Sequence, residues 1–83
     1  MEISVQPQSN NCFHIYTNKG TYLQSYNSII AFMPIKGKIQ LDAHFWDYSR
    51  TTGKHRNDFL DECIAETRAK IESKEYLLTN LNK

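Results

Sequence analysis

The sequence predicts an α+β fold: a three- to five-stranded antiparallel sheet, arranged as a meander, with one long C-terminal helix packed on one face. Two observations support this class. Apolar and polar residues alternate in short segments between residues 3 and 43, as they do in half-buried strands. Beyond residue 58 the apolar residues recur at intervals of three and four, as they do along one face of a helix. The 83 residues suffice for a single domain, 1–83, with one modest core.

The first expected elements lie in the N-terminal quarter. Ile3 and Val5 alternate with polar residues before Pro7, a pattern typical of a short edge strand that ends in the polar run 8–11. The sequence 17–21 contains an Asn and a Gly and separates two alternating segments. This combination predicts a β-hairpin whose turn needs a residue in the left-handed region.

Two further strands are expected before the helix. A dense apolar segment over 22–33 is broken by small polar residues around Asn27, which allow a bend or a bulge before a strand at about 28–33. A second turn signal occupies 34–38. The alternation over 39–43 then predicts a last, half-buried strand.

A single long helix is expected from about Thr52 to Leu77, because no Pro or Gly occurs in 54–83. Ser49, Thr51 and Thr52 are all competent N-cap residues. The positions expected on its apolar face are Phe59, Leu60, Cys63, Ile64, Thr67 and Ile71.

Composition excludes several classes of protein. Ten Lys and Arg against nine Asp and Glu give a net charge of +1, which argues against a histone-like or strongly acidic protein. Cys12 and Cys63 are far apart and belong to no zinc or disulfide pattern, so we expect reduced thiols and no metal or other cofactor. No signal peptide or apolar run of about 18 residues is present. A cytoplasmic protein without membrane contact is therefore expected.

The most informative segment surrounds the expected helix start. Its cations stand where the helix macrodipole disfavours positive charge by about 0.3–1 kcal/mol each. Hydroxyl residues and Gly53 accompany them, so hydroxyls, backbone N–H groups and cations could converge on a phosphate or carboxylate. The candidate anion or nucleic-acid site comprises Tyr48, Arg50, Thr51, Thr52, Lys54, His55 and Arg56.

A structural interpretation of the same segment stays open. Ser and Thr before a helix commonly only cap it, and Arg and Lys are commonly solvated. A phosphate-binding loop is excluded, because no G-x-x-x-x-G-K-[ST] motif occurs. The chain also lacks RNP, GXXG and zinc-knuckle signatures, so nucleic-acid binding is inferred from local chemistry alone.

Aromatic residues near the cations favour single-stranded RNA or DNA, where stacking contributes about 1–3 kcal/mol per base. Trp46 is a candidate for this role, but in a domain this small the core is the favoured place for it. The aromatic set is Phe45, Trp46 and Tyr48, with Tyr16, Tyr22 and Tyr26 from the expected sheet.

Catalysis is a less favoured alternative. A small metal-independent ribonuclease would draw its acid, base and cation from His44, His55, Lys54, Tyr48 and Asp58. No motif fixes two of these groups at a working distance, so a non-enzymatic role is favoured. Nothing in the sequence brings the histidines, which include His14, together as metal ligands.

The expected helix also suggests protein contacts. Its acidic stripe is either a solvated face or part of a two-signed surface that pairs with a second copy or a protein target. Tyr76, Leu77 and Leu78 would suit a dimer contact or would close the core. A domain of this size gains only about 3–5 kcal/mol from its core, so self-association is a reasonable expectation. The stripe is Asp58, Asp61, Glu62 and Glu66, with Glu66 and Lys70 spaced for an ion pair.

Two segments carry a resemblance to known domains. They are SYNSIIA at 25–31 and YSRTTGKHRNDFL at 48–60, with the patterns S-Y-x-S-x-I-A and Y-S-x-T-T-x-K-H-x-x-x-F-L. They resemble a family of small uncharacterised domains encoded by bacteriophages and prophages, over about the middle half of the chain. The resemblance implies a genomic setting in which small proteins bind nucleic acid or inhibit host factors, including defence systems. It assigns no role to any residue.

The expected function is therefore that of a small phage-encoded, non-enzymatic protein that binds a host macromolecule through the surface 48–56. RNA or another phosphate-bearing ligand comes first, because cations at a helix N-terminus are otherwise unfavourable. Inhibition of a host defence or toxin protein by direct contact comes second, and a possible homodimer accompanies either role.

Overall fold

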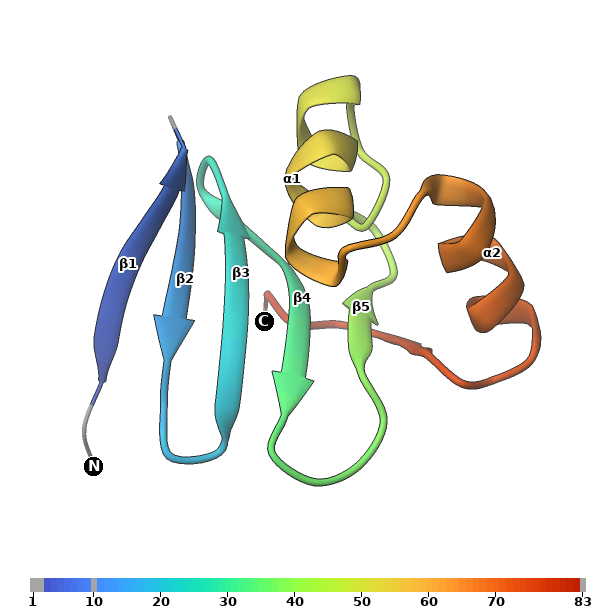
Figure 1. The fold of residues 1–83 in the computed structure, drawn as a ribbon, viewed down its shortest axis with the longest axis horizontal. Coiled ribbons are helices and arrows are strands. Elements are labelled where there is room, and N and C mark those ends of the chain that lie inside the picture. The colour runs from blue at the N-terminus through green and yellow to red at the C-terminus, as the bar shows by residue number, and fades with distance from the viewer. Residues whose placement is uncertain (1–2, 10, 83) are drawn as a thin grey trace.

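The computed structural model describes residues 3–9 and 11–82. Six strands and two helices follow one another along the chain (Figure 1). In order they are β1 (Ser4–Ser9), β2 (Cys12–Tyr16), β3 (Gly20–Ser25), β4 (Ser28–Pro34), β5 (Gln40–Asp42), α1 (Arg50–Leu60), α2 (Ile64–Glu72) and β6 (Leu77–Thr79).

The strands form one sheet in the order β1-β2-β3-β4-β5-β6. The first five strands pair antiparallel as a meander, whereas β5 and β6 pair in parallel. The α+β class and the meander are confirmed. The strand count and the all-antiparallel expectation are wrong, because residues expected in a helix form β6.

Pro7 lies within β1, an edge strand, where a missing backbone N–H is tolerated. The expected edge strand is confirmed, and it continues through Pro7 to Ser9. The expected hairpin joins β2 and β3, and its turn is closed by the Thr17 N–H, which donates to the Gly20 carbonyl at 2.9 Å. Gly20 has φ +151°, and a side chain there would meet the Met33 carbonyl.

The bend expected near Asn27 is a tight turn between β3 and β4 followed by a bulge. Tyr26 takes the left-handed conformation, with φ 56°. Leu23 pairs with Ala31 while its neighbour Gln24 pairs with Ile29, so Ile30 is the extra residue of a β-bulge. Ile30 is buried in the core.

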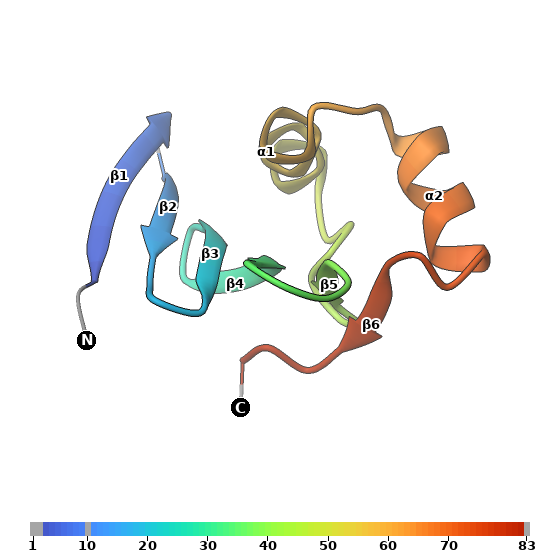
Figure 2. The same ribbon diagram turned by 60° about the horizontal axis from the view of Figure 1, so that its bottom comes forward.

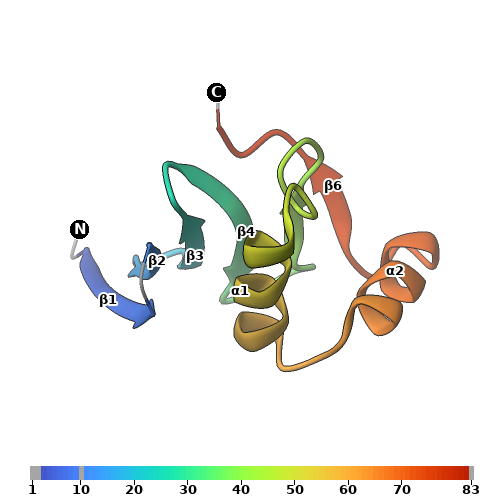
Figure 3. The ribbon, with the colours of Figure 1, turned by 90° about the horizontal axis from the view of Figure 1, so that it is seen from above.

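Both helices lie on the same side of the sheet (Figures 2 and 3). The core beneath them comprises Cys12, Leu23, Ile30, Ala31, Leu41 and Tyr76, with α1 in contact with β3 and β4. The opposite face carries the paired series Val5, Ile15, Tyr22 and Phe32, in which the Tyr22 and Phe32 rings stack at 4.3 Å. Packing of the helical part on one face is thus confirmed.

The single long helix is wrong: the chain breaks between Leu60 and Ile64. Asp61 is left-handed, with φ 55°, and ends α1. Cys63 starts α2, and its backbone N–H donates to the Glu66 carboxylate at 3.3 Å. The break changes the direction of the chain and brings α2 beside β6.

Glu62 supplies a physical reason for this break. Its side chain is 3% exposed and accepts hydrogen bonds from Thr67 Oγ1 at 2.6 Å, Tyr76 Oη at 2.8 Å and Lys70 Nζ at 2.9 Å. Burial alone would raise the pKa of Glu62, but these hydrogen bonds outweigh it and lower the pKa. The acidic stripe that includes Glu62 and Glu66 is therefore not a uniformly solvated face. Lys70 pairs with Glu62 instead of the expected Glu66.

The segment expected to end the helix returns to the sheet instead. Lys74, with φ 69°, ends the turn after α2, and Tyr76 then enters the core. The Leu77 N–H donates to the Ile39 carbonyl at 2.9 Å, which begins the parallel pairing with β5. Of the residues proposed for a dimer contact, Tyr76 closes the core, whereas Leu77 and Leu78 are exposed on the edge strand.

Candidate functional site

The start of α1 is fixed by Ser49, one of the three expected N-cap residues. Its Oγ accepts the Thr52 N–H at 3.1 Å, while its own backbone is extended. No acidic residue stands in the first turn of α1. The seven candidate residues then divide into two sets. Tyr48, Arg50, Thr51 and Lys54 are exposed, whereas Thr52, His55 and Arg56 are buried.

Thr52 and His55 face β3, not solvent. Ser25 Oγ lies 2.9 Å from His55 Nδ1 and 3.2 Å from Thr52 Oγ1, so three polar side chains satisfy one another beneath α1. Burial lowers the pKa of His55; the nearby Lys54 charge adds to this effect, and Asp58 opposes it. Both residues therefore attach α1 to the sheet in this structure, and their contact with a ligand stays a prediction.

Arg56 is also an internal residue, with 1% exposure. Its Nη1 donates to the Trp46 carbonyl at 2.8 Å and to Asp47 Oδ1 at 3.1 Å, and its Nη2 donates to Asn57 Oδ1 at 2.9 Å. The guanidinium carbon lies 5.3 Å from the centre of the Trp46 ring. Arg56 therefore organises the loop before α1, and its charge is already paired.

Trp46 packs against the core, as one of its two interpretations predicted. Its ring faces a second cation, Arg68 of α2, at 5.8 Å. Arg68 Nη2 also lies 3.4 Å from Asp47 Oδ2. Loop, α1 and α2 thus meet at this point, and Trp46 is not an exposed stacking platform.

The exposed cations border an open groove of about 600 Å³ beside α1. Arg50 and Lys54 form no ion pair in the part of the chain that the structure describes. Their charges are therefore available to an external anion. The groove is lined by Asp47, Ser49, Arg50, Gly53, Lys54, Arg56, Asn57, Asp58 and Ile64.

An aromatic cluster directly precedes the groove along the chain. The rings of His44 and Phe45 lie 4.4 Å apart, and Tyr48 lies 5.3 Å from Phe45 and 6.0 Å from His44. Tyr48 is 65% exposed. The sequence singled out Phe45 and Tyr48 as aromatic partners but considered His44 only for catalysis or metal binding. The adjacency of His44 to Phe45 is the signal that could have included it.

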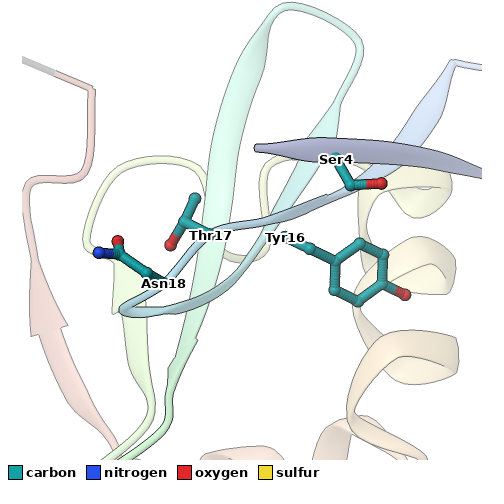
Figure 4. A pocket seen from close by; sticks show the side chains of 4 residues that line it. All are labelled: Ser4, Tyr16, Thr17 and Asn18. Carbon is teal, nitrogen blue, oxygen red and sulfur yellow. The ribbon is translucent and has the colours of Figure 1, made fainter. Parts of the chain in front are cut away.

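The sheet tyrosines take no part in this cluster. Tyr26 lies at the β3–β4 turn, with its ring 6.2 Å from His55. Tyr22 stacks on Phe32 on the helix-free face. Tyr16 ends β2 and helps to line a separate hollow of about 390 Å³ with Ser4, Thr17 and Asn18 (Figure 4). None of the described residues that line this hollow carries a charged side chain.

The three histidines have separate environments. His14 contacts the Gln8 side chain and packs its ring 5.0 Å from Phe59, and burial lowers its pKa. His55 is bound to Ser25, and His44 belongs to the aromatic cluster. Within the described ranges no hydrogen bond joins any two of them, and no cluster of three or more metal-ligating acidic, histidine or cysteine side chains is found.

Comparison with known protein families finds a match to a family of unknown function, DUF8033, over residues 3–77. The chain belongs to this family. The expected likeness to an uncharacterised domain is confirmed at that level, and the match extends beyond the middle half to include β1 and α2. No curated protein and no solved structure matches the DUF8033 chain significantly. Among its described residues, no helix is long and apolar enough to cross a membrane.

Proposed function

We propose that this DUF8033 chain is a non-enzymatic binding protein that recognises a phosphate-bearing macromolecule, in first place RNA, through Tyr48, Arg50, Thr51 and Lys54. One observation carries the proposal: Arg50 and Lys54 are exposed in the first two turns of α1, and neither has an acidic partner among the described residues. Both border the groove, which is large enough for a phosphate group and its neighbours.

Electrostatics favour an anion at this position. Each cation near the start of a helix costs about 0.3–1 kcal/mol, and an acid in the first turn that would offset this cost is absent. A bound phosphate would turn this cost into a stabilisation, because it would accept charge-assisted hydrogen bonds from Arg50 and Lys54. The exposed hydroxyl of Thr51 adds a neutral donor beside them.

The buried candidates act as support in this proposal. Thr52 and His55 fix α1 to β3 through Ser25, and Arg56 fixes the preceding loop through Asp47. The exposed residues are therefore presented by a well-anchored helix, which reduces the entropy lost when a ligand binds. The proposed contact surface is narrower than the segment 48–56 that the sequence indicated.

The resemblance to phage and prophage domains adds a biological setting to the proposal. The target would be a host macromolecule in the cytoplasm of the infected cell, bound during takeover or to counter host defence. The absence of a pattern for metal or nucleotide binding in the sequence favours binding over catalysis.

A second candidate is direct inhibition of a host protein, and the helix-free face favours it. The described positions of β1 to β4 on this face carry no charged side chain and are mostly apolar, and depletion of charge is typical of the centre of a protein interface. The exposed Leu77 on β6, which pairs with Gln40, would extend an interface on this face with a host protein or a second copy. The residues of the face include Val5, Phe13, Ile15, Tyr22, Gln24 and Phe32.

A pull-down of the tagged protein from host lysate, with and without nuclease, separates the two candidates. The wild type should recover nuclease-sensitive RNA, and the double variant Arg50→Ala/Lys54→Ala should lose it. The matched control is Lys19→Ala/Lys36→Ala, which removes two exposed cations from turns at the opposite end of the sheet (Figure 1). Recovery of one nuclease-resistant host protein, without RNA, would overturn the first candidate in favour of the second.

A further inference from the structure

A pocket of about 340 Å³ lies between the loop that follows β5 and the C-terminal tail. Its volume falls in the range of about 300–1,000 Å³ typical of small-ligand sites. It is lined by Asp42, Ala43, His44, Phe45, Asn80 and Asn82. His44 and Phe45 also belong to the aromatic cluster, in which the Tyr48 ring lies 6.0 Å from His44 and 5.3 Å from Phe45.

Asp42 holds the two walls of this pocket together. Its Oδ2 accepts the backbone N–H groups of Phe45 at 2.9 Å and His44 at 3.1 Å, and its Oδ1 accepts that of Leu81 at 2.7 Å. The side chain of Asn82 pairs with both the N–H and the carbonyl of Ile29, each at 2.7 Å. Loop and tail are thus fixed without a ligand, and the pocket is preformed.

The chemistry of the walls suits a flat, polar-edged ring. The His44 and Phe45 rings are perpendicular, with 90° between their planes, so one ring can lie against a face of the ligand while the other meets its edge. The side-chain oxygen of Asn80 accepts the Asn82 N–H, and among the described residues its amide nitrogen donates to no group. One amide donor therefore remains for the edge of a ligand.

We propose that this pocket takes an unpaired nucleobase of a single-stranded RNA, with Tyr48 stacking on an adjacent base. The inference rests on the proposed function, because the cations Arg50 and Lys54 beyond Tyr48 would bind the phosphates of the same strand. It also names the substrate class more narrowly: in a duplex the bases are stacked and paired, so they cannot enter such a pocket. Single strands leave bases free to stack on exposed side-chain rings.

The test compares two fluorescent RNA strands of equal length and charge, one intact and one with abasic positions. The intact strand should bind the wild type roughly tenfold more tightly, a factor typical of one stacked base. Tyr48→Ala should weaken binding of the intact strand, because the adjacent base loses its stacking partner, and should leave binding of the abasic strand unchanged, whereas Tyr48→Phe should bind the intact strand like the wild type. Tyr16→Ala, which removes an exposed tyrosine at the far end of β2, is the matched control.

The outcomes distinguish this inference from the proposed function. Equal affinity for intact and abasic strands, or tighter binding of an RNA duplex, would overturn the base pocket and leave phosphate recognition by Arg50 and Lys54 in place. Failure of the wild type to bind either strand would overturn both. The substitution Asn80→Leu in the pocket should weaken binding of the intact strand and leave binding of the abasic strand unchanged. Asn80 is exposed, and its amide nitrogen has no other described partner.

Discussion

Asp47 Oδ1 lies 3.1 Å from Nη1 of the buried Arg56, and its second carboxylate oxygen lies 3.4 Å from Nη2 of the exposed Arg68. One acid on the loop before α1 therefore contacts a cation from each helix. The same two cations lie 5.3 Å and 5.8 Å from the centre of the Trp46 ring. This arrangement explains why the sequence carries so many charges around the start of α1: some organise the fold, and others are left at the surface.

Arg56 and Arg50 should differ sharply in their effect on stability. Arg56→Ala removes a buried side chain and leaves the Trp46 carbonyl and Asp47 Oδ1 without the donor Nη1, so the free energy of unfolding should fall by about 2–4 kcal/mol. Arg50→Ala changes an exposed residue and should alter the free energy of unfolding by no more than about 0.5 kcal/mol. Urea denaturation measures both, and equal effects would show that the Arg56 contacts do not stabilise the fold.

Stability should fall as the pH is lowered from about 7 towards 5.5. Burial lowers the pKa values of His14 and His55 below the ordinary value of 6.5, so the unfolded chain takes up protons in this range while the folded chain resists them. The pKa values of Asp42 and Glu62 are also lowered in the folded chain. Protonation of these two acids therefore reduces stability only in more acidic solution, below about pH 4.5.

Denaturant melts at several pH values check this prediction. His55→Gln should flatten the dependence between pH 7 and 5.5, and adding His14→Gln should flatten it further, whatever the absolute stability of each variant. A dependence that survives unchanged in the double variant would show that other groups cause it.

Gly20 and Gly37 form a matched pair for testing the turns. In Gly20→Ala the new Cβ would lie 2.6 Å from the Pro34 Cα, so the β3–β4 backbone must shift. In Gly37→Ala the nearest neighbour is a Pro34 side-chain carbon at 4.0 Å, which leaves only the cost of φ +106°. We expect losses of about 3 kcal/mol or more for Gly20→Ala and about 1–2 kcal/mol for Gly37→Ala. Thermal unfolding that ranks them in reverse would contradict the assigned hairpin geometry.

Replacing Gly53 by Ala should raise the stability of the protein, unlike the two substitutions above. Gly53 lies inside α1, where a helix has room for a Cβ atom. A Cβ at this position would be 3.5 Å from both Arg56 Nη2 and Asp47 Oδ1, which is normal contact. Gly53→Ala should therefore stabilise the protein by about 0.5–1 kcal/mol through helix propensity. Calorimetry would reveal a lowered melting temperature if the Asp47–Arg56 pair needs the open space.

The elements that the sequence predicted well are those set by nearby residues. The Asn and Gly of 17–21 define the β2–β3 turn, and the polar residues around Asn27 accompany the β3–β4 turn. β6 and the helix break depend instead on distant partners: Glu62 turns inward because Tyr76 and Lys70 reach it in the fold. Helix propensity alone could not reveal that meeting, so one long helix was expected.

The candidate site was predicted as a segment, but the structure divides it by helix face. Thr52, His55, Arg56 and Phe59 occupy positions i, i+3, i+4 and i+7 of α1, the spacing of one inward helix face. The polarity of Thr52, His55 and Arg56 suggested exposure, and only the positions of Ser25 and Asp47 show how these three side chains are satisfied inside. The exposed residues Arg50, Thr51 and Lys54 agree with the surface that the sequence predicted.

The most direct test of the proposed function is the salt dependence of single-stranded RNA binding, measured by fluorescence anisotropy from about 50 to 200 mM salt. The wild type and the control Lys19→Ala/Lys36→Ala should share one steep log–log slope. Arg50→Ala/Lys54→Ala should bind more weakly, with a slope shallower by about 1.4, because each lost phosphate contact removes about 0.7. The same slope in all three proteins, or no binding by the wild type, would contradict RNA recognition at the start of α1.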